Sequence, residues 1–230
     1  QCNTQNGNGG GIGLSANNLE SIRFNNCDFQ NVQNTNQGGA VSFGVDNTND
    51  MNVFFDTCTF TGNQANNGGS LYFNIPQSIL ISQCTFMQQT SGIANGGSIY
   101  IENQPEITIV SSVFNQTKAT ANGNAIYIAQ TTVNTSIILQ LCTFENCQNS
   151  DNNVIYSQAS QLLLNQTEIR FTTTETTCCG LDISAPCELT IFNSQFTNCS
   201  SSKDGSALNY KPASTGTERI VLNRTTFTNN

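Results

Sequence analysis

The strongest constraint on this chain is an internal repeat that returns every 26 to 30 residues along its whole length. The repeats align on a Gly-Gly-small-aliphatic element, and every start is followed three positions later by an aliphatic residue. The eight starts are Gly9, Gly38, Gly68, Gly96, Gly123, Asn152, Cys178 and Gly205. A fixed period of this length is typical of solenoids, in which each repeat buries its apolar face only against its neighbours.

The second half of each repeat is more regular than the first. An apolar pair at i and i+2 is followed five residues later by a large apolar residue, as in Ile79, Ile81 and Phe86. Alternation at a step of two predicts short strands with one buried face. The large residue is Ile169 in one repeat and Phe in the other seven, and we expect these Phe side chains to stack in the core: Phe29, Phe60, Phe86, Phe114, Phe144, Phe196 and Phe227.

Three short strands per repeat, with no helical periodicity between them, predict an all-β fold. We predict a right-handed parallel β-helix of about eight coils that forms a single domain over residues 1–230. Stacking would place Leu71 over Ile99 and Phe86 over Phe114. A β-sandwich also uses short alternating strands, but it does not require identical positions at a fixed period.

The step of five before the large apolar residue predicts a corner between the second and third strands. Polar residues occupy this step at Asn25, Asp56, Asn165 and Asn223, where Asn and Asp tolerate a left-handed backbone. A small or thiol side chain lies two residues before the large apolar residue in every repeat, at Cys27, Cys58, Cys84, Ser112, Cys142, Thr167, Ser194 and Thr225.

Ten cysteines and no histidine exclude zinc sites that mix the two residue types, and no CxxC pair is present. We therefore expect no metal and no cofactor. The cysteines in the small position fit a row of buried thiols, yet stacked Cα atoms about 4.8 Å apart also lie within disulfide range. Loop positions favour disulfides for the later cysteines, although connectivity cannot be deduced. The disulfide candidates are Cys2, Cys58, Cys84, Cys147, Cys178, Cys179, Cys187 and Cys199.

Five N-x-S/T sequons make the chain a candidate glycoprotein, at Asn115, Asn134, Asn165, Asn198 and Asn223. Together with an even cysteine count they indicate an oxidising, extracellular or cell-surface setting. No signal peptide is visible at Gln1, so we expect a processed form, or a window of a longer chain.

The Gly-Gly-small-aliphatic element at Gly38–Val41, Gly68–Leu71 and Gly96–Ile99 resembles the GGAI/FxxN repeats of chlamydial polymorphic outer-membrane proteins. It is also similar to the pectin-lyase-like parallel β-helix surface proteins of protists. A literal FxxN occurs at Phe60–Asn63 and Phe227–Asn230, whereas other repeats depart from it. The resemblance covers the entire chain and implies a fold and a surface location, not a substrate. The sequons and the Asn content, 34 residues, favour a eukaryotic microbe.

Composition excludes several function classes. A net charge of −8 argues against nucleic acid as a partner, and no apolar run is long enough to span a membrane. Glycoside hydrolysis needs two carboxyl groups about 5–10 Å apart, but the acidic residues are scattered over different positions of the repeat. We therefore do not expect an enzyme; a polysaccharide-active enzyme is the less favoured alternative.

Neither end of the chain has a sequence typical of the capping segment that normally covers the terminal coil of a β-helix. In internal repeats the next start lies 8 to 10 positions after the large apolar residue. If Gln1 of another copy followed Asn230, Gly9 of that copy would lie 12 positions after Phe227. We hypothesise an extracellular structural protein whose copies stack head to tail into a glycosylated filament, with Cys2 placed to bond a neighbour. The alternative is an adhesin that recognises a partner through the long loops Asp46–Asn52 and Pro212–Arg219.

Overall fold

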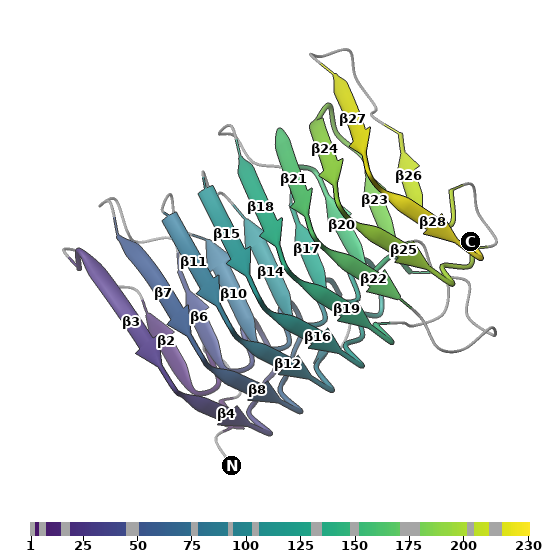
Figure 1. The fold of residues 1–230 in the computed structure, drawn as a ribbon. Coiled ribbons are helices and arrows are strands. Elements are labelled where there is room, and N and C mark those ends of the chain that lie inside the picture. Colours follow the sequence, from purple (N-terminus) through teal and green to yellow (C-terminus); the bar gives the residue numbers. More distant parts are fainter. Residues whose placement is uncertain are drawn as a thin grey trace.

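Each repeat forms three strands, and equivalent strands of successive repeats pair in parallel (Figure 1). The computed structural model describes residues 3–4, 8–14, 19–44, 51–74, 78–91, 94–102, 106–129, 135–147, 152–170, 180–201, 205–211 and 218–230. The described residues form an all-β parallel solenoid with three strands per coil, as predicted, and each of the three main sheets has eight strands. The labelled ends of the chain lie at opposite ends of the stack (Figure 1).

The first sheet follows the Gly-Gly element and contains β2 (Ile12–Leu14), β6 (Val41–Phe43), β10 (Leu71–Asn74), β14 (Ile99–Glu102), β17 (Ile126–Ile128), β20 (Ile155–Ser157), β23 (Leu181–Ile183) and β26 (Leu208–Tyr210). The second sheet contains β3 (Ser21–Asn25), β7 (Asn52–Asp56), β11 (Ser78–Ser82), β15 (Glu106–Val110), β18 (Ser136–Gln140), β21 (Gln161–Asn165), β24 (Glu188–Phe192) and β27 (Arg219–Asn223).

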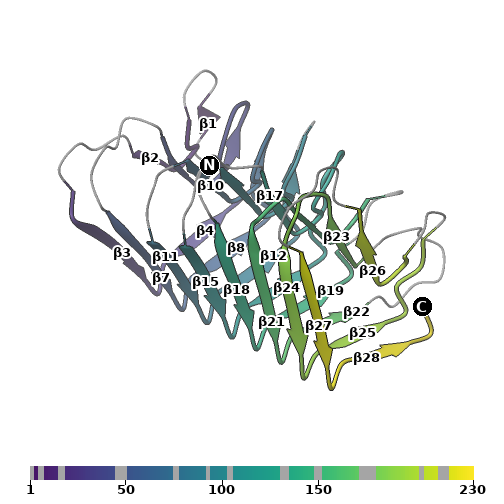
Figure 2. The same ribbon diagram turned by 90° about the horizontal axis from the view of Figure 1, so that it is seen from above.

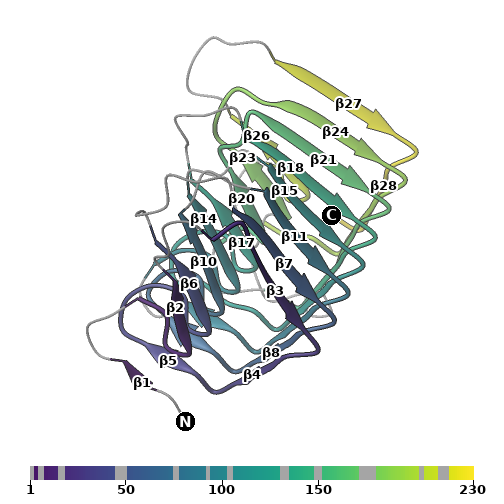
Figure 3. The ribbon, with the colours of Figure 1, turned by 90° about the vertical axis from the view of Figure 1, so that its left-hand side faces the viewer.

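The third sheet contains β4 (Asp28–Gln30), β8 (Thr59–Thr61), β12 (Thr85–Met87), β16 (Val113–Asn115), β19 (Thr143–Glu145), β22 (Glu168–Arg170), β25 (Gln195–Thr197) and β28 (Thr226–Thr228). A fourth, short sheet was not predicted; it contains β1 (Asn3–Thr4), β5 (Gln33–Asn34), β9 (Gln64–Ala65) and β13 (Thr90–Ser91). The three main sheets surround the core (Figure 3).

The core consists of rows of like side chains that run along the solenoid axis. Leu71 pairs with Ile99, and Phe86 with Phe114, as the repeat alignment predicts. The rings from Phe60 through Phe86 and Phe114 to Phe144 stack with centroids 4.7 Å apart at each step. Each such pair stabilises the fold by about 0.5–1.5 kcal/mol beyond the burial of its area.

Not every predicted core Phe is equally buried. Phe60, Phe86, Phe114, Phe144 and Phe196 are 0% exposed. Phe29 in the first coil is partly buried and packs against the core. Phe227 in the last described coil is 43% exposed, so the last Phe of the row is open to solvent.

The corner between the second and third sheets lies one residue later than predicted. Asn25, Asp56, Asn165 and Asn223 are the last residues of their strands, and their successors hold the left-handed backbone. These successors have φ between 50° and 55°: Asn26, Thr57, Gln83, Ser111, Leu141, Gln166, Asn193 and Arg224. Six residue types occupy this position, and the backbone ladder continues through the turn, as in the bond from Thr57 N to the Ser82 carbonyl, 2.9 Å. The resulting corner repeats along the whole stack (Figure 2).

Candidate functional site: polar core rows and exposed end coils

The small side chains of the predicted thiol row form hydrogen bonds between coils. The Cys58 thiol donates to the Phe24 carbonyl of the preceding coil at 3.4 Å. The Cys84 sulfur accepts the Cys58 N–H at 3.4 Å, which continues the row in the next coil. Serine and threonine do the same further along: Ser112 accepts from Cys84 N, and Thr167 donates to the Leu139 carbonyl. This position therefore requires a small side chain that can both donate and accept.

A second polar row lies three residues after the large apolar residue. The Asn63 side chain donates to the Phe29 carbonyl at 2.9 Å, and its oxygen accepts the Val32 N–H at 2.9 Å. Gln89 bonds the Phe60 carbonyl at 2.7 Å and accepts Asn63 N–H at 3.0 Å. Asn230 repeats the pattern on the Phe196 carbonyl at 3.1 Å. The literal FxxN motif thus marks an amide that bridges two coils.

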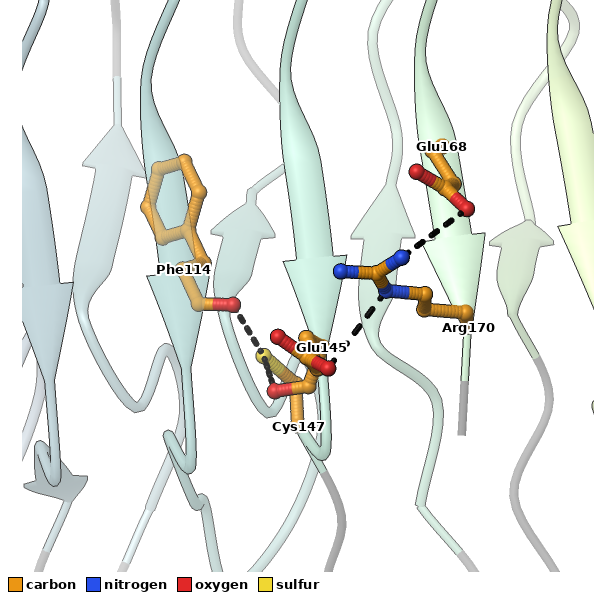
Figure 4. A network of polar contacts seen from close by, with 5 residues as sticks. All are labelled: Phe114, Glu145, Cys147, Glu168 and Arg170. Carbon is orange, nitrogen blue, oxygen red and sulfur yellow. Dashed lines mark hydrogen bonds and ion pairs between the residues drawn. The ribbon is translucent and has the colours of Figure 1, made fainter. Parts of the chain in front are cut away.

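Cys147 and Cys199 occupy this second row, whereas their sequence context favoured loops. Both are 0% exposed, as is Cys187. The Cys147 thiol donates to the Phe114 carbonyl at 3.3 Å (Figure 4). All three lie in connecting segments outside the strands, as expected, but they are buried and do not lie at the surface.

The structure does not support a disulfide at any described candidate. Cys58, Cys84, Cys147, Cys187 and Cys199 are all thiols. Burial raises the pKa of Cys84 and of Cys187 to about 12. Burial likewise raises the pKa of Cys142 and of Cys147 to about 11, so these thiols stay protonated at neutral pH. The remaining candidates, Cys2, Cys178 and Cys179, lie outside the described residues.

The sequons fall into two structural groups. Asn198, just after β25, and Asn223, at the end of β27, are exposed. Asn115 ends β16 and Asn165 ends β21, and the side-chain oxygen of each is buried without a hydrogen-bond partner. Asn134 lies outside the described residues.

One cluster of charged side chains connects two coils on the outer face of the third sheet. Arg170 Nε lies 3.5 Å from Glu145 Oε1, and its Nη1 lies 3.4 Å from Glu168 Oε1 (Figure 4). The Arg170 and Glu145 side chains are 41% and 25% exposed, so water screens the pair. Surface pairs of this kind contribute about 0–1 kcal/mol, so this cluster adds little to the stability of the fold.

Two open hollows are present on the described surface, and neither resembles a catalytic cleft. One, of about 320 Å³, lies over the second sheet beside Ile138, Leu163 and Glu188. The other, of about 290 Å³, lies beside Asn8 and Ser42. Neither brings together the two carboxyl groups that glycoside hydrolysis uses.

Within the described ranges, no three His, Cys, Asp or Glu side chains are placed to hold a metal ion. The described residues also include no helix that is long and apolar enough to cross a membrane. Most of the long loops Asp46–Asn52 and Pro212–Arg219, which the adhesin alternative invokes, lies outside the described residues.

The last coil exposes apolar side chains that are buried in the coils before it. Ile220 and Leu222 are each 46% exposed, whereas Leu189 and Ile191, one coil earlier, are 0% exposed. The strands β26, β27 and β28 are each the last of their sheet, so one edge of each carries unpaired backbone groups. This coil carries three of the six large apolar side chains that are exposed among the described residues.

The fold and these features define the class of the protein as a parallel β-solenoid. No protein-family model, no curated protein and no solved structure matches the chain.

Proposed function

We propose that the protein is an extracellular structural protein whose copies stack head to tail into a glycosylated filament. The exposed apolar face of the last coil carries this proposal. Phe227 is 43% exposed there, whereas Phe196 in the preceding coil is 0% exposed. Covering such side chains stabilises an assembly by about 25 cal/mol per Å² of apolar area removed from water.

The first coil has the chemistry needed to cover the last one. If the register between neighbouring coils continued across the junction, each of these apolar residues of the last coil would face an apolar residue of the next copy. The pairs would be Leu208 with Ile12, Ile220 with Ile22, Leu222 with Phe24 and Phe227 with Phe29. Heterologous contacts that do not close into a ring generate open filaments.

The extracellular setting is part of the proposal and has separate support. The exposed sequon at Asn198 lies just after β25, one coil before the end, whereas Asn223 ends β27 within the proposed contact. A surface built from Asn, Gln, Ser and Thr with few charges also fits a structural role better than recognition of a charged ligand.

The test compares two substitutions that are matched in residue type and exposure. Leu222 and Leu141 are both 46% exposed, but Leu222 lies on the end coil and Leu141 at a corner on the flank. We expect the purified unmodified chain to form filaments in electron microscopy and to sediment as a polymer. Leu222→Asp should give monomers, whereas Leu141→Asp should polymerise normally.

Two results would overturn the proposal. The unmodified chain could stay monodisperse at every concentration, which would show that the end coil is not an interface between copies. Alternatively, Leu141→Asp could abolish assembly as fully as Leu222→Asp, which would place the contact on the flank.

A further inference from the structure

Four tyrosines form a continuous stack on the outer face of the first sheet. Tyr72, Tyr100, Tyr127 and Tyr156 are the second residues of β10, β14, β17 and β20 and pair in register. Their flanking residues in the strands point into the core, so the rings point outward. Successive ring centroids lie 5.3, 5.0 and 4.9 Å apart, with interplanar angles of 15°, 15° and 7°.

Packing alone does not require tyrosine in this row. The same outward position is held by Gly13 and Ser42 in the coils before the stack, and by Asp182 and Asn209 in the coils after it. The interior aromatic rows of this chain use Phe instead. The stack therefore places four phenols, which have redox chemistry that Phe lacks, at consecutive coils.

The environment of the hydroxyl groups changes along the stack. Tyr72 is 2% exposed, and its hydroxyl donates to a Glu102 carboxylate oxygen at 2.7 Å. Tyr100, Tyr127 and Tyr156 are partly exposed. Burial raises the pKa of Tyr100 and of Tyr127, so their phenols are neutral at physiological pH.

We propose that Tyr100, Tyr127 and Tyr156 are an oxidative cross-linking site, at which a peroxidase with hydrogen peroxide joins neighbouring phenols into dityrosine across coils. Each of two phenols loses one electron and its hydroxyl proton. The two phenoxyl radicals then form one C–C bond between ring carbons next to the oxygens. The hydrogens displaced from those carbons return to the oxygens through water and restore both phenols. Hydrogen peroxide takes up the two electrons and two protons and becomes two molecules of water.

The geometry supports coupling within one chain. Neighbouring rings are held close and nearly parallel, which converts an encounter of two radicals into a unimolecular step. The rings of Tyr100, Tyr127 and Tyr156 point away from the core and are partly exposed, which leaves room for neighbouring rings to tilt together; the Tyr156 hydroxyl accepts a hydrogen bond from the Ser184 hydroxyl at 2.6 Å. A link from Tyr127 to Tyr100 or to Tyr156 would tie adjacent coils covalently and limit the freedom of the unfolded chain, as a disulfide does.

The experiment treats the dilute full chain with horseradish peroxidase and hydrogen peroxide, and maps the linked peptides by mass spectrometry. We expect dityrosine fluorescence without a change in molecular size, and linked peptides that have lost two hydrogen atoms. The links should join Tyr100 to Tyr127 and Tyr127 to Tyr156. The oxidised chain should also resist thermal unfolding better than the untreated chain.

Two variants test the assignment. Tyr127→Phe keeps the ring stack but removes two of the three neighbouring phenol pairs, and the pair that remains includes buried Tyr72. The dityrosine signal should fall by at least half. Tyr210→Phe is the control, because the Tyr210 hydroxyl lies outside the stack and bonds the Cys187 backbone. Its dityrosine yield should match that of the unmodified chain.

The peptide map of the unmodified chain decides the question even if a variant folds poorly. Links found mainly between molecules, or mainly at Tyr210, would overturn the proposal, as would folded protein that gives no dityrosine. The filament plays no part in this test, so failure of one proposal does not affect the other.

Discussion

The side-chain amide of Asn63 bonds the backbone carbonyl of Phe29, one coil earlier, at 2.9 Å. The same side chain accepts the Val32 N–H at 2.9 Å and is itself 0% exposed. The Asn63 side-chain oxygen is therefore the acceptor for the Val32 N–H at a turn between sheets. The bond explains why a polar residue is kept inside a row that faces the core.

We predict that Asn63→Leu destabilises the fold, because the Val32 N–H then loses its acceptor inside the protein. Leaving a buried donor unpaired costs about 1–3 kcal/mol. Gln64→Ala, at an exposed position one residue later, should stay within about 0.5 kcal/mol of the unmodified chain. The midpoint of urea unfolding measures both, and equal midpoints for Asn63→Leu and the unmodified chain would refute the bridging role.

A second prediction uses two serines at the same position of adjacent coils. Ser70 and Ser98 are both 0% exposed. The Ser70 hydroxyl donates to Gln89 Oε1 at 2.7 Å, whereas the Ser98 hydroxyl has no hydrogen-bond partner. Ser70→Ala should lower the free energy of unfolding by about 1 kcal/mol or more, and Ser98→Ala should leave it unchanged or raise it. Equal losses in denaturant unfolding would show that the hydroxyl bond does not distinguish the two coils.

The third prediction concerns the close approach of backbone atoms in neighbouring coils. A Cβ on Gly69 would overlap the backbone oxygen of Gly97 and come within 2.9 Å of the Thr90 oxygen. Both obstacles are backbone atoms and cannot rotate away, so Gly69→Ala should cost at least the 1–3 kcal/mol or so that overpacking usually costs. A Cβ on Gly44 meets nothing nearer than the Leu14 oxygen at 3.8 Å, and Gly44→Ala should be neutral. Thermal unfolding followed by circular dichroism compares the two; a fully stable Gly69→Ala chain would contradict the observed spacing.

The repeat predicts most of this fold, and its failures have specific physical causes. Alternation at Ile79 and Ile81 correctly predicts β11, because one face of the strand is buried. The corner was placed one residue early, since the turn accepts Thr57 or Leu141 and composition cannot mark it. The two-residue strand β9 (Gln64–Ala65) is too short to show an alternating pattern.

The polar rows were predicted only in part. The row of small side chains two residues before the large apolar residue was predicted from the sequence, because Cys, Ser and Thr are similar in size. The second row holds Val32, Asn63, Gln89 and Cys147 in different coils, so neither size nor polarity identifies it from the sequence. What most of its members share is a bond to a carbonyl of the preceding coil, as the Gln89 amide makes with Phe60 and the Cys147 thiol with Phe114.

The sequons yield a fourth prediction, which applies to expression in a eukaryotic secretory system. Asn198 and Asn223 are exposed, and we expect both to carry N-glycans. Asn115 and Asn165 have buried side-chain oxygens within strands, and we expect less modification there. Mass spectrometry of peptides before and after enzymatic deglycosylation measures each site. Full occupancy at Asn115 with Asn198 unmodified would show that the folded surface does not predict the pattern.

The buried thiols give the last prediction, a loss of stability in alkali. Burial raises the pKa of Cys142 and of Cys147 from 9.0 to about 11. Below pH 9.0 these thiols are protonated in both the folded and the unfolded chain. Above it the unfolded chain loses its thiol protons first, so the free energy of unfolding falls by up to about 1.4 kcal/mol per pH unit for each thiol, until the pH passes the folded pKa.

Cys142→Ser with Cys147→Ser isolates this effect, because serine does not titrate in this range and can donate to the same carbonyls, those of Ile109 and Phe114. We expect the double variant to lose stability less steeply than the unmodified chain between about pH 9 and about pH 11. Urea unfolding in the presence of a reductant, at a series of pH values, measures both slopes. Identical slopes would mean that these two thiols ionise as readily in the folded chain as in the unfolded one, in conflict with their burial.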